Sequence, residues 1–388
     1  TEKSTGRKIA LKHFKMKNQK SEGMPITAIR EIKCLMKIAR KKRANAQLAQ
    51  KFENIVELLE VCPGNSSKFD ESEEEGPEFT VALEYVDHDL TGLLYDKRLK
   101  SMNVAEVKGL MQQLLRGTAA LHSENILHRD IKACNLLIDN SGMLKMTDFG
   151  LCRELPEKNH YGYKGSVQLT HRVVTIWYRS PELLLGCKNY NGCVDMWSCG
   201  CVLAEMLFRK PLFPGKTDIE QLGLILKVCG NPKEESWFLD SMRPRKKNPR
   251  VLKPALFKRI DELERVLYPS SMFADLTNFR GKVKTDKEQL LDLLSKLLDV
   301  NHKSRISALD ALKHPWFRKS PIKPVKKRFH LGFSCRDLDI RKRQMAKHKN
   351  RVSATGRGAA TPQQQQHHKK LNALNSVSNS NHSVNPHA

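Results

Sequence analysis

The chain has 388 residues and a formal net charge of +26, from 68 Lys and Arg residues against 42 Asp and Glu residues. No run approaches the ~18 uninterrupted apolar residues of a membrane span, and no apolar signal region opens the sequence, so we exclude an integral membrane protein and expect the ten cysteines to be reduced thiols. The 39% hydrophobic content supports a sizeable core, in a length typical of two or three domains.

The predicted elements begin with strands and continue with helices. Residues 8–14 alternate between apolar and polar and indicate a strand, whereas 27–40 have helical periodicity after Pro25, which suits a helix start. Further strands are predicted over 54–61 and 79–86. The later periodicity is helical, over 104–123, 195–210, 217–229 and 286–299. A strand-rich piece ahead of a larger helix-rich piece is typical of an α+β protein with two lobes.

The positive charge is concentrated near the C-terminus. Residues 318–388 hold 16 Lys and Arg against 2 Asp and Glu, more than half of the net charge. This segment is poor in large apolar residues, so it cannot bury enough surface to offset its ordering entropy. We therefore expect 1–317 to fold and 318–388 to be a disordered tail. This tail is either solvated without a specific ligand, a nuclear import signal, a segment that binds acidic partners, or one that contacts nucleic acid nonspecifically.

Two short apolar segments joined by a turn carry the predicted chemistry. The sequence ILHRDIKACNLLI ends at Ile138, the turn DNSG follows, and MLKMTDFG ends at Gly150. A hairpin between these segments brings Asn135 close to Asp148, and Mg²⁺ prefers such amide and carboxylate oxygens. Asp130 precedes the hairpin, where it can accept a proton from an attacking hydroxyl, and Lys132 can offset the charge of a transferring phosphate.

These motifs resemble the catalytic and metal-binding loops of eukaryotic protein kinases. The resemblance covers roughly residues 4–317 and implies ATP and Mg²⁺ as cofactors. It implies that Lys12, in the sequence IALK, binds phosphate and pairs with Glu31. Taken singly, the motif residues have ordinary interpretations as a capping residue, a strand-edge charge or a solvated helix face. Their common order along the chain favours the kinase interpretation.

Three later elements extend the resemblance in the order that the family has. They are the triplet SPE that ends at Glu182, the segment that begins at Asp195, and a late Arg305. In the family, the equivalents of Glu182 and Arg305 form a buried pair, and that of Asp195 braces the catalytic loop. Cys152 replaces a common Ala, either as inert packing or as a redox-sensitive thiol.

The implied fold is a two-lobed α+β protein-kinase fold. A small β-rich N-lobe would span 1–86 and a larger helical C-lobe 87–317, followed by the tail 318–388. The glycine-rich loop that covers the ATP phosphates in the family would precede the lysine strand, and it is missing from a sequence that begins at Thr1. Since the polar catalytic residues are intact, we expect an N-terminally truncated sequence rather than a kinase that has lost its loop.

The resemblance also implies a nucleotide pocket between the lobes. The hinge would run from Glu84 to Val86 and bind the base through its backbone, with Leu83 as gatekeeper. Ala10 and Leu137 would enclose the adenine, and Asp87 or Asp89 would meet the ribose. The apolar members of this set would serve equally well as core residues.

The segment PITAIRE, which ends at Glu31, resembles the helix signature of cyclin-dependent kinases. The segment HRVVTIWYRSPELLLG resembles their activation segment and implies phosphorylation of Thr170 by an activating kinase. Three arginines would bind that phosphate, namely Arg30, Arg129 and Arg153. The substrate residues would be Val174, Thr175 and Arg179, and Ile29 would contact a cyclin.

The predicted function is a cyclin-dependent Ser/Thr kinase that transfers the γ-phosphate of ATP to Ser/Thr-Pro sites. The residues of the helix signature resemble those of the transcription-elongation branch, which phosphorylates the C-terminal tail of RNA polymerase II. This resemblance implies nuclear localisation, with an additional cytoplasmic pool as the alternative. Two other functions stay open. One is a pseudokinase or cyclin-binding scaffold, and the other is a nucleic-acid-associated factor in which the basic tail is the working part.

Overall fold

The fold is described from a computed structural model. It describes residues 3, 5–14, 24–63, 79–156, 158–159, 162–163, 175–188, 190–229, 280–318, 323–326, 329 and 335. All of them belong to a compact unit, Thr1–Asp337, and a second unit is Leu338–Ala388. Over these described ranges, no helix is long and apolar enough to cross a bilayer.

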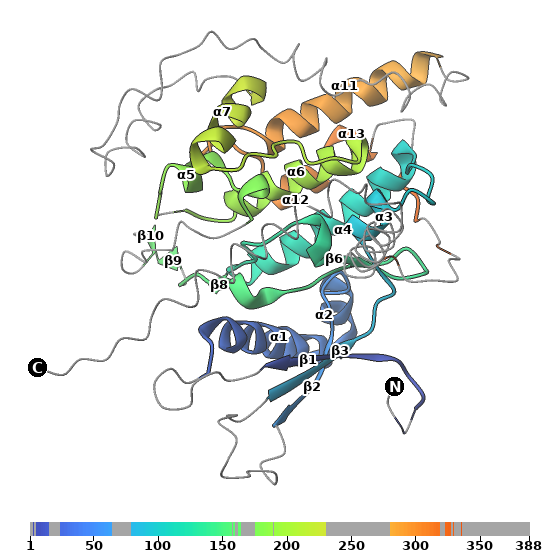
Figure 1. The fold of residues 1–388 in the computed structure, drawn as a ribbon, viewed down its shortest axis with the longest axis vertical. Helices are drawn as coiled ribbons and strands as arrows, with labels where there is room; N and C mark the ends of the chain where they lie inside the picture. The colour runs from blue at the N-terminus through green and yellow to red at the C-terminus, as the bar shows by residue number, and fades with distance from the viewer. Residues whose placement is uncertain are drawn as a thin grey trace, which may run out of the picture. The chain divides into compact units, whose positions relative to one another are not determined.

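The N-terminal lobe combines a three-stranded antiparallel sheet with two helices (Figure 1). Strand β3 (Phe79–Glu84) lies between β1 (Ile9–Phe14) and β2 (Leu58–Pro63). Helix α1 (Ile26–Ala44) begins after Pro25, and α2 (Ala46–Lys51) is capped by the side chain of Asn45. The register places Lys12 opposite Val81, near the middle of β1. Lys12 therefore lies near the middle of an edge strand of the sheet.

One predicted strand starts later than expected. We predicted a strand over 54–61, but β2 begins at Leu58. Asn54 and Val56 instead bond to Met146, because the Met146 N–H donates to Asn54 O at 2.9 Å and the Val56 N–H donates to Met146 O at 3.0 Å. These residues join the lobes rather than extend the sheet.

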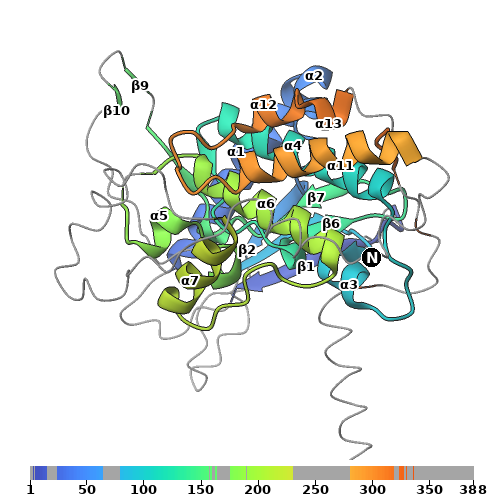
Figure 2. The same cartoon turned by 90° about the horizontal axis from the view of Figure 1, so that it is seen from above.

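The C-terminal lobe is mostly helical, and its helices group apart from the β1–β3 sheet (Figures 1 and 2). The long helix α4 (Val104–Ser123) opens with a capping box in which Asn103 and Glu106 satisfy each other's backbone N–H groups. The other helices are α3 (Leu90–Tyr95), α5 (Pro181–Leu184), α6 (Cys193–Phe208), α7 (Asp218–Cys229), α11 (Arg280–Leu297), α12 (Ala308–Leu312) and α13 (Pro315–Arg318).

Short strands and single-turn helices connect these helices. The strands are β4 (His88–Asp89), β5 (Ile126–Leu127), β6 (Leu136–Ile138), β7 (Leu144–Met146), β8 (Arg153–Glu154), β9 (Lys158–Asn159) and β10 (Gly162–Tyr163). The single-turn helices are η2 (Ala133–Asn135), η3 (Phe149–Leu151) and η4 (Ile176–Tyr178). The predicted hairpin is formed by β6 and β7.

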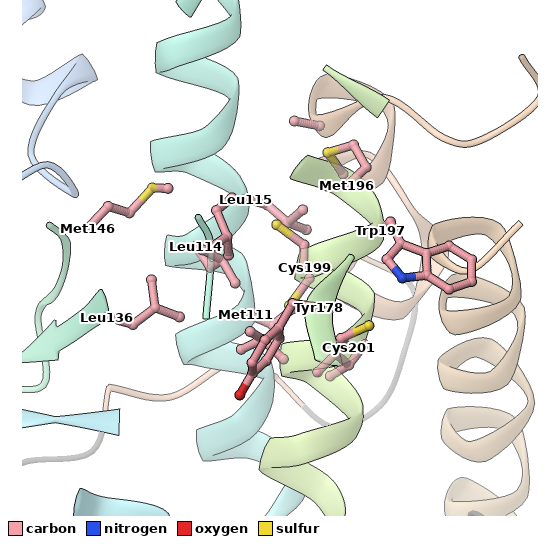
Figure 3. Packing of buried hydrophobic residues seen from close by; sticks show 14 of the residues in the cluster. Met111, Leu114, Leu115, Leu136, Met146, Tyr178, Met196, Trp197, Cys199 and Cys201 are labelled. Carbon is pink, nitrogen blue, oxygen red and sulfur yellow. The ribbon is translucent and has the colours of Figure 1, made fainter. Parts of the chain in front are cut away.

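The core of this lobe lies around α4 and α6. Figure 3 shows Met111 and Leu115 of α4 beside Cys199 of α6, whereas Trp197 points to the other side of α6. Trp197 is fully buried and stacks on Phe213, with ring centroids 5.9 Å apart. These interlocking apolar side chains give the C-lobe a rigid base for the loops that carry the polar residues.

The folded unit continues beyond the predicted boundary at residue 317. We call the described residues 323–326, 329 and 335 the C-terminal strap. The Val325 N–H donates to Ala105 O at 3.0 Å, and the Phe329 N–H donates to Asn140 O at 2.9 Å. Phe329 and Cys335 are 5% and 0% exposed. The strap thus packs on the C-lobe, because two apolar anchors bury themselves within an otherwise basic segment. The rest of the predicted tail, 336–388, lies outside the described residues.

Candidate active site

Lys12 of β1 and Glu31 of α1 form an ion pair that ties the helix to the sheet. Lys12 Nζ lies 2.9 Å and 2.7 Å from the two carboxylate oxygens of Glu31, and 3.4 Å from Asp148 Oδ1. Glu31 is 2% exposed, whereas the Lys12 side chain is 39% exposed. Burial raises the pKa of Glu31, and the attraction of Lys12 only partly offsets this rise. The pair therefore presents a cation that is open on one side, next to a second carboxylate.

Asp130 lies at the centre of a polar cluster on the catalytic loop. Its Oδ2 accepts hydrogen bonds from Lys132 Nζ at 2.7 Å and from Asn135 Nδ2 at 3.0 Å. Lys132 Nζ also donates to Thr175 Oγ1 at 3.1 Å. Burial by itself would lower the pKa of Lys132, but the hydrogen bond and the charge of Asp130 outweigh burial and raise it. Lys132 is therefore a cation at neutral pH, beside a carboxylate that can accept a proton.

A second, deeply buried carboxylate holds the catalytic loop in place. Asp195 is 1% exposed and accepts from the backbone N–H groups of His128, at 3.0 Å, and Arg129, at 2.8 Å. Its Oδ2 also lies 2.8 Å from His122 Nε2. Arg129 has a φ of 63°, a left-handed conformation that is uncommon for a side-chain-bearing residue. Burial by itself would raise the pKa of Asp195, but these donors lower it, so Asp195 braces the loop as an anion.

The hairpin brings Asn135 and Asp148 to adjacent places. In β6 and β7, Leu136 lies opposite Met146, and the Thr147 N–H donates to Asn135 O at 3.0 Å. Asp148 has a φ of 63° and a side chain that is 44% exposed. The Nδ2 of Asn135 is engaged with Asp130, so its amide oxygen is the atom that can serve as a ligand. One carboxylate and one amide oxygen fit Mg²⁺, which takes its other ligands from phosphates and water.

Three arginines from separate elements come together beside α1. Arg129 is 2% exposed, and it donates to Leu151 O at 2.8 Å and to the Tyr190 hydroxyl at 2.9 Å. Burial lowers the pKa of Arg30, and the charges of Arg129 and Arg153 lower it further. The Nε of Arg30 is buried and makes no hydrogen bond within the described residues. A group of like charges with an unsatisfied donor is a place where an anion would be stabilised. Sequence reasoning missed Tyr190, for which the motif carries no signal.

The residues of the predicted nucleotide pocket differ in exposure, and their carboxylates bind neighbouring protein groups. Leu83 and Val86 are buried, and Ala10 and Leu137 are partly exposed. The carboxylate of Glu84 accepts from the Glu57 N–H at 2.7 Å and lies 3.1 Å from Lys145 Nζ. Asp87 likewise bonds to the backbone, because its Oδ2 accepts from the Asn140 N–H at 3.3 Å. The carboxylates of this segment thus stabilise local structure.

Asp89 also has a structural task, and the C-terminal strap ends beside it. Asp89 Oδ1 accepts from the Gly92 N–H at 2.7 Å and caps α3, and its own N–H donates to Cys335 O at 3.2 Å. The Cys335 N–H donates to His88 Nδ1 at 3.0 Å. The His88 ring lies 5.8 Å from that of Phe329. Sequence analysis missed this contact between the strap and β4, although two apolar residues in a basic segment were a signal for it.

The remaining predicted site residues lie at the surface or outside the described residues. Arg179 Nη1 lies 2.8 Å from Asp218 Oδ1, which ties this arginine to the start of α7. Ile29 is 42% exposed on α1, and Ile26 of the same helix is 57% exposed. Exposed apolar side chains on one helix are typical of a protein-binding surface. Thr170 and Val174 lie outside the described residues.

Comparisons with known proteins agree with this geometry. The family model of the protein kinase domain matches residues 1–317. Cyclin-dependent kinase 9 of Danio rerio is 38% identical over 323 residues, which cover 82% of this chain and 76% of the relative. Cyclin-dependent kinase 12 of Caenorhabditis elegans is 39% identical over 330 residues, which cover 83% of this chain and 39% of the relative. The chain also spans 56% of cyclin-dependent kinase C-1 of Arabidopsis thaliana, so it covers only part of several curated relatives.

Two solved structures are similar to the chain at 33% sequence identity. The yeast RNA Pol II CTD kinase CTDK-1 complex has a TM-score of 0.60, with 83% of this chain and 88% of that chain covered. The CAK complex of Chaetomium thermophilum bound to ATP-gamma-S has a TM-score of 0.65, with 82% and 85% covered. These likenesses confirm the predicted two-lobed α+β fold. The chain therefore belongs to the protein kinase family and, within it, to the cyclin-dependent kinases.

Proposed function

We propose that this protein is a cyclin-dependent Ser/Thr kinase that transfers the γ-phosphate of ATP to Ser or Thr followed by Pro. The observation that carries the proposal is the convergence of three elements on one place. Lys12 from β1 lies 3.4 Å from Asp148, which follows β7, and the catalytic loop ahead of β6 presents Asp130 and Asn135. The intact polar set favours transfer of phosphate over the scaffold alternative.

The residues divide the chemistry between them. Asp130 accepts the proton of the substrate hydroxyl as its oxygen bonds to the γ-phosphorus and the bond to the leaving ADP oxygen breaks. Lys132 lies 2.7 Å from Asp130 and offsets negative charge that develops on the phosphoryl group. Lys12 binds the phosphates that remain on ADP. Mg²⁺, held by Asn135 and Asp148, would neutralise charge on the phosphates.

Activation rests on the helix that carries Glu31. An exposed apolar surface on α1, including Ile29, favours a cyclin as the partner that holds this helix. A phosphate on Thr170 would bring close to two negative charges to the three arginines and relieve their mutual repulsion. Because these arginines come from α1, the catalytic loop and β8, their shared ligand would join all three elements. An activating kinase would add this phosphate.

The relatives favour a function in transcription. Their names include cyclin-dependent kinases 9 and 12, and one solved neighbour is named as an RNA Pol II CTD kinase. We therefore propose the C-terminal tail of RNA polymerase II as a substrate and the nucleus as the place of action. The basic segment 336–388 would add nonspecific attraction to nucleic acid.

A phosphotransfer assay tests this proposal. The protein, expressed from its complete coding sequence with candidate cyclins, should transfer labelled phosphate to Ser-Pro repeat peptides and not to matched Ser-Ala peptides. Asp130→Asn should lower the rate by about 10²–10⁴-fold, the usual contribution of a general base. Asp148→Asn should abolish ATP-dependent transfer. Equal transfer by the Asp148→Asn variant would sink the mechanism.

A further inference from the structure

Two thiols meet where α1 packs against the segment that follows β7. Cys34 lies one turn after Arg30 on α1, and Cys152 follows η3 directly. Helix α1 packs against η3, and this packing brings both cysteines to the lining of one cavity. Cys152 Sγ donates to Arg30 O, at 3.5 Å. The two cysteines are therefore neighbours although 118 positions separate them in the numbering.

Both cysteines line one cavity. Its volume is about 540 Å³, and its other lining residues include four cations, Arg30, Lys33, Lys37 and Arg153. The cysteines are 6% and 4% exposed, so large reagents do not reach them from the surface. A cavity of this size admits water and solutes of similar size. Cationic surroundings with access to small molecules are typical of cysteines that undergo oxidation.

We propose that Cys34 and Cys152 form a reversible disulfide bond that joins α1 to the segment after β7, with hydrogen peroxide as the oxidant. One sulfur, as thiolate, attacks a peroxide oxygen, the O–O bond breaks, and a sulfenic acid and hydroxide result. The second sulfur attacks the sulfenic sulfur, the S–S bond forms, and the S–O bond breaks with loss of water. In sum, two thiols are oxidised and one peroxide is reduced to two waters. A dithiol reductant reverses the reaction.

The order of attack follows from the surroundings of Cys34. Its hydrogen bond with Cys152 and its burial raise its pKa well above the usual range, so Cys34 is a thiol at neutral pH. We assign the first attack on peroxide to Cys152, which lies next to Arg153 in the lining of the cavity, and the resolving step to Cys34.

The bond would hold α1 in the arrangement that the structure has. Glu31 lies one turn before Cys34 on the same helix and pairs with Lys12. A covalent link at Cys34 would restrict movement of Glu31 away from Lys12. The proposal goes beyond the proposed function and does not depend on it, because the disulfide is detected without any activity measurement.

Peptide mapping tests the bond directly. The folded full-length protein is treated with hydrogen peroxide, its remaining thiols are blocked with N-ethylmaleimide, and it is digested with trypsin without reduction. Cleavage after Lys33, Lys37, Lys145 and Arg153 yields peptides 34–37 and 146–153, each with a single cysteine. We expect these peptides to be joined, with the loss of two hydrogen atoms, and to separate after dithiothreitol. Their absence as a joined pair, or preferential joining of either to a third cysteine, would overturn the proposal.

Variants test the order of attack. Cys34→Ser should stop at a sulfenic acid on Cys152 that dimedone traps, whereas Cys152→Ala should leave Cys34 unoxidised. Cys62→Ser, at a partly exposed cysteine in β2, is the matched control and should form the bond in unchanged yield. Dimedone labelling of Cys34 in the Cys152→Ala variant would contradict the assigned order. Should either variant fail to fold, as judged by circular dichroism, the joined peptides of the unaltered protein still decide the proposal.

Discussion

Two buried glutamates, one in each lobe, are each bound by a single cation at both oxygens. Arg305 donates to Glu182 at 2.7 Å and 3.0 Å, and both side chains are fully buried. Lys12 donates to Glu31 at 2.9 Å and 2.7 Å, but the Lys12 side chain is 39% exposed. Burial by itself would raise the pKa of both carboxyls. The enclosed Arg305 outweighs burial and lowers the pKa of Glu182, whereas the pKa of Glu31 stays raised.

The difference separates a structural pair from a functional one. Arg305 also donates to Cys193 O at 2.8 Å and to Asp299 O at 2.9 Å, and its guanidinium lies 5.1 Å from the centre of the Trp197 ring. The guanidinium N–H groups of Arg305 thus bond to groups of the C-lobe itself. Lys12 instead shares its charge with Asp148 and keeps an exposed side. An enclosed pair holds a lobe together, while a half-open pair leaves a cation for a ligand.

The largest effect on stability is expected at the enclosed pair. Glu182→Gln would leave the charge of Arg305 buried without a counter-ion, and we expect it to lower the free energy of unfolding by about 3–5 kcal/mol. Denaturant unfolding measures this loss. The matched control is Glu31→Gln, which should change the free energy of unfolding by less than about 1 kcal/mol, since its partner is partly solvated. Similar losses from both variants would break the comparison.

A smaller effect, on activity, is expected at the half-open pair. Glu31→Gln frees Lys12 from its fixed place, and a misplacement of about 1 Å lowers rates by about 10²-fold. Steady-state kinetics with a Ser-Pro peptide measures kcat/KM for this variant. Thermal unfolding in parallel should show little change. A loss of activity that appeared only together with unfolding would mean that Glu31 serves stability instead.

The smallest effect is expected in the pH dependence. The folded-state pKa of Glu182 is lowered, so its pair contributes stability above the unfolded-state pKa, about 4.3, and loses it as the pH falls through the folded-state value. The contribution of Glu31 to stability depends on pH with the opposite sign. Its folded-state pKa is raised, so stability is lost as the pH rises through that value and the carboxyl group ionises. Activity needs the Glu31 carboxylate, so kcat/KM should fall on the acid side at a higher pH than for an ordinary Glu. A wild-type profile with no such fall above that ordinary range would contradict this assignment.

Sequence reasoning was strongest where the chemistry lies in short motifs. Two short apolar segments joined by the turn DNSG predicted a hairpin, and β6 and β7 form it because the turn is local and both strands are apolar. The same reasoning placed Lys12 on a strand and Glu31 on a helix, and the structure joins them at 2.7 Å. The assigned roles of these residues stay predictions until the variants are measured. For Thr170 and Val174, placement also stays a prediction.

By itself the sequence determined the kinase family, the order of strands and helices and the local motifs, because these depend on neighbouring residues and on hydrophobic periodicity. Only the tertiary structure decided those meetings of distant residues that no motif indicated. It set Tyr190 against Arg129, the strap against β4 and Cys34 near Cys152, and it enclosed Arg305 more fully than Lys12. Solvent access and burial are properties of packed surfaces that come from many segments, and they determine whether the same pair of charges stabilises the fold or stays available to a ligand.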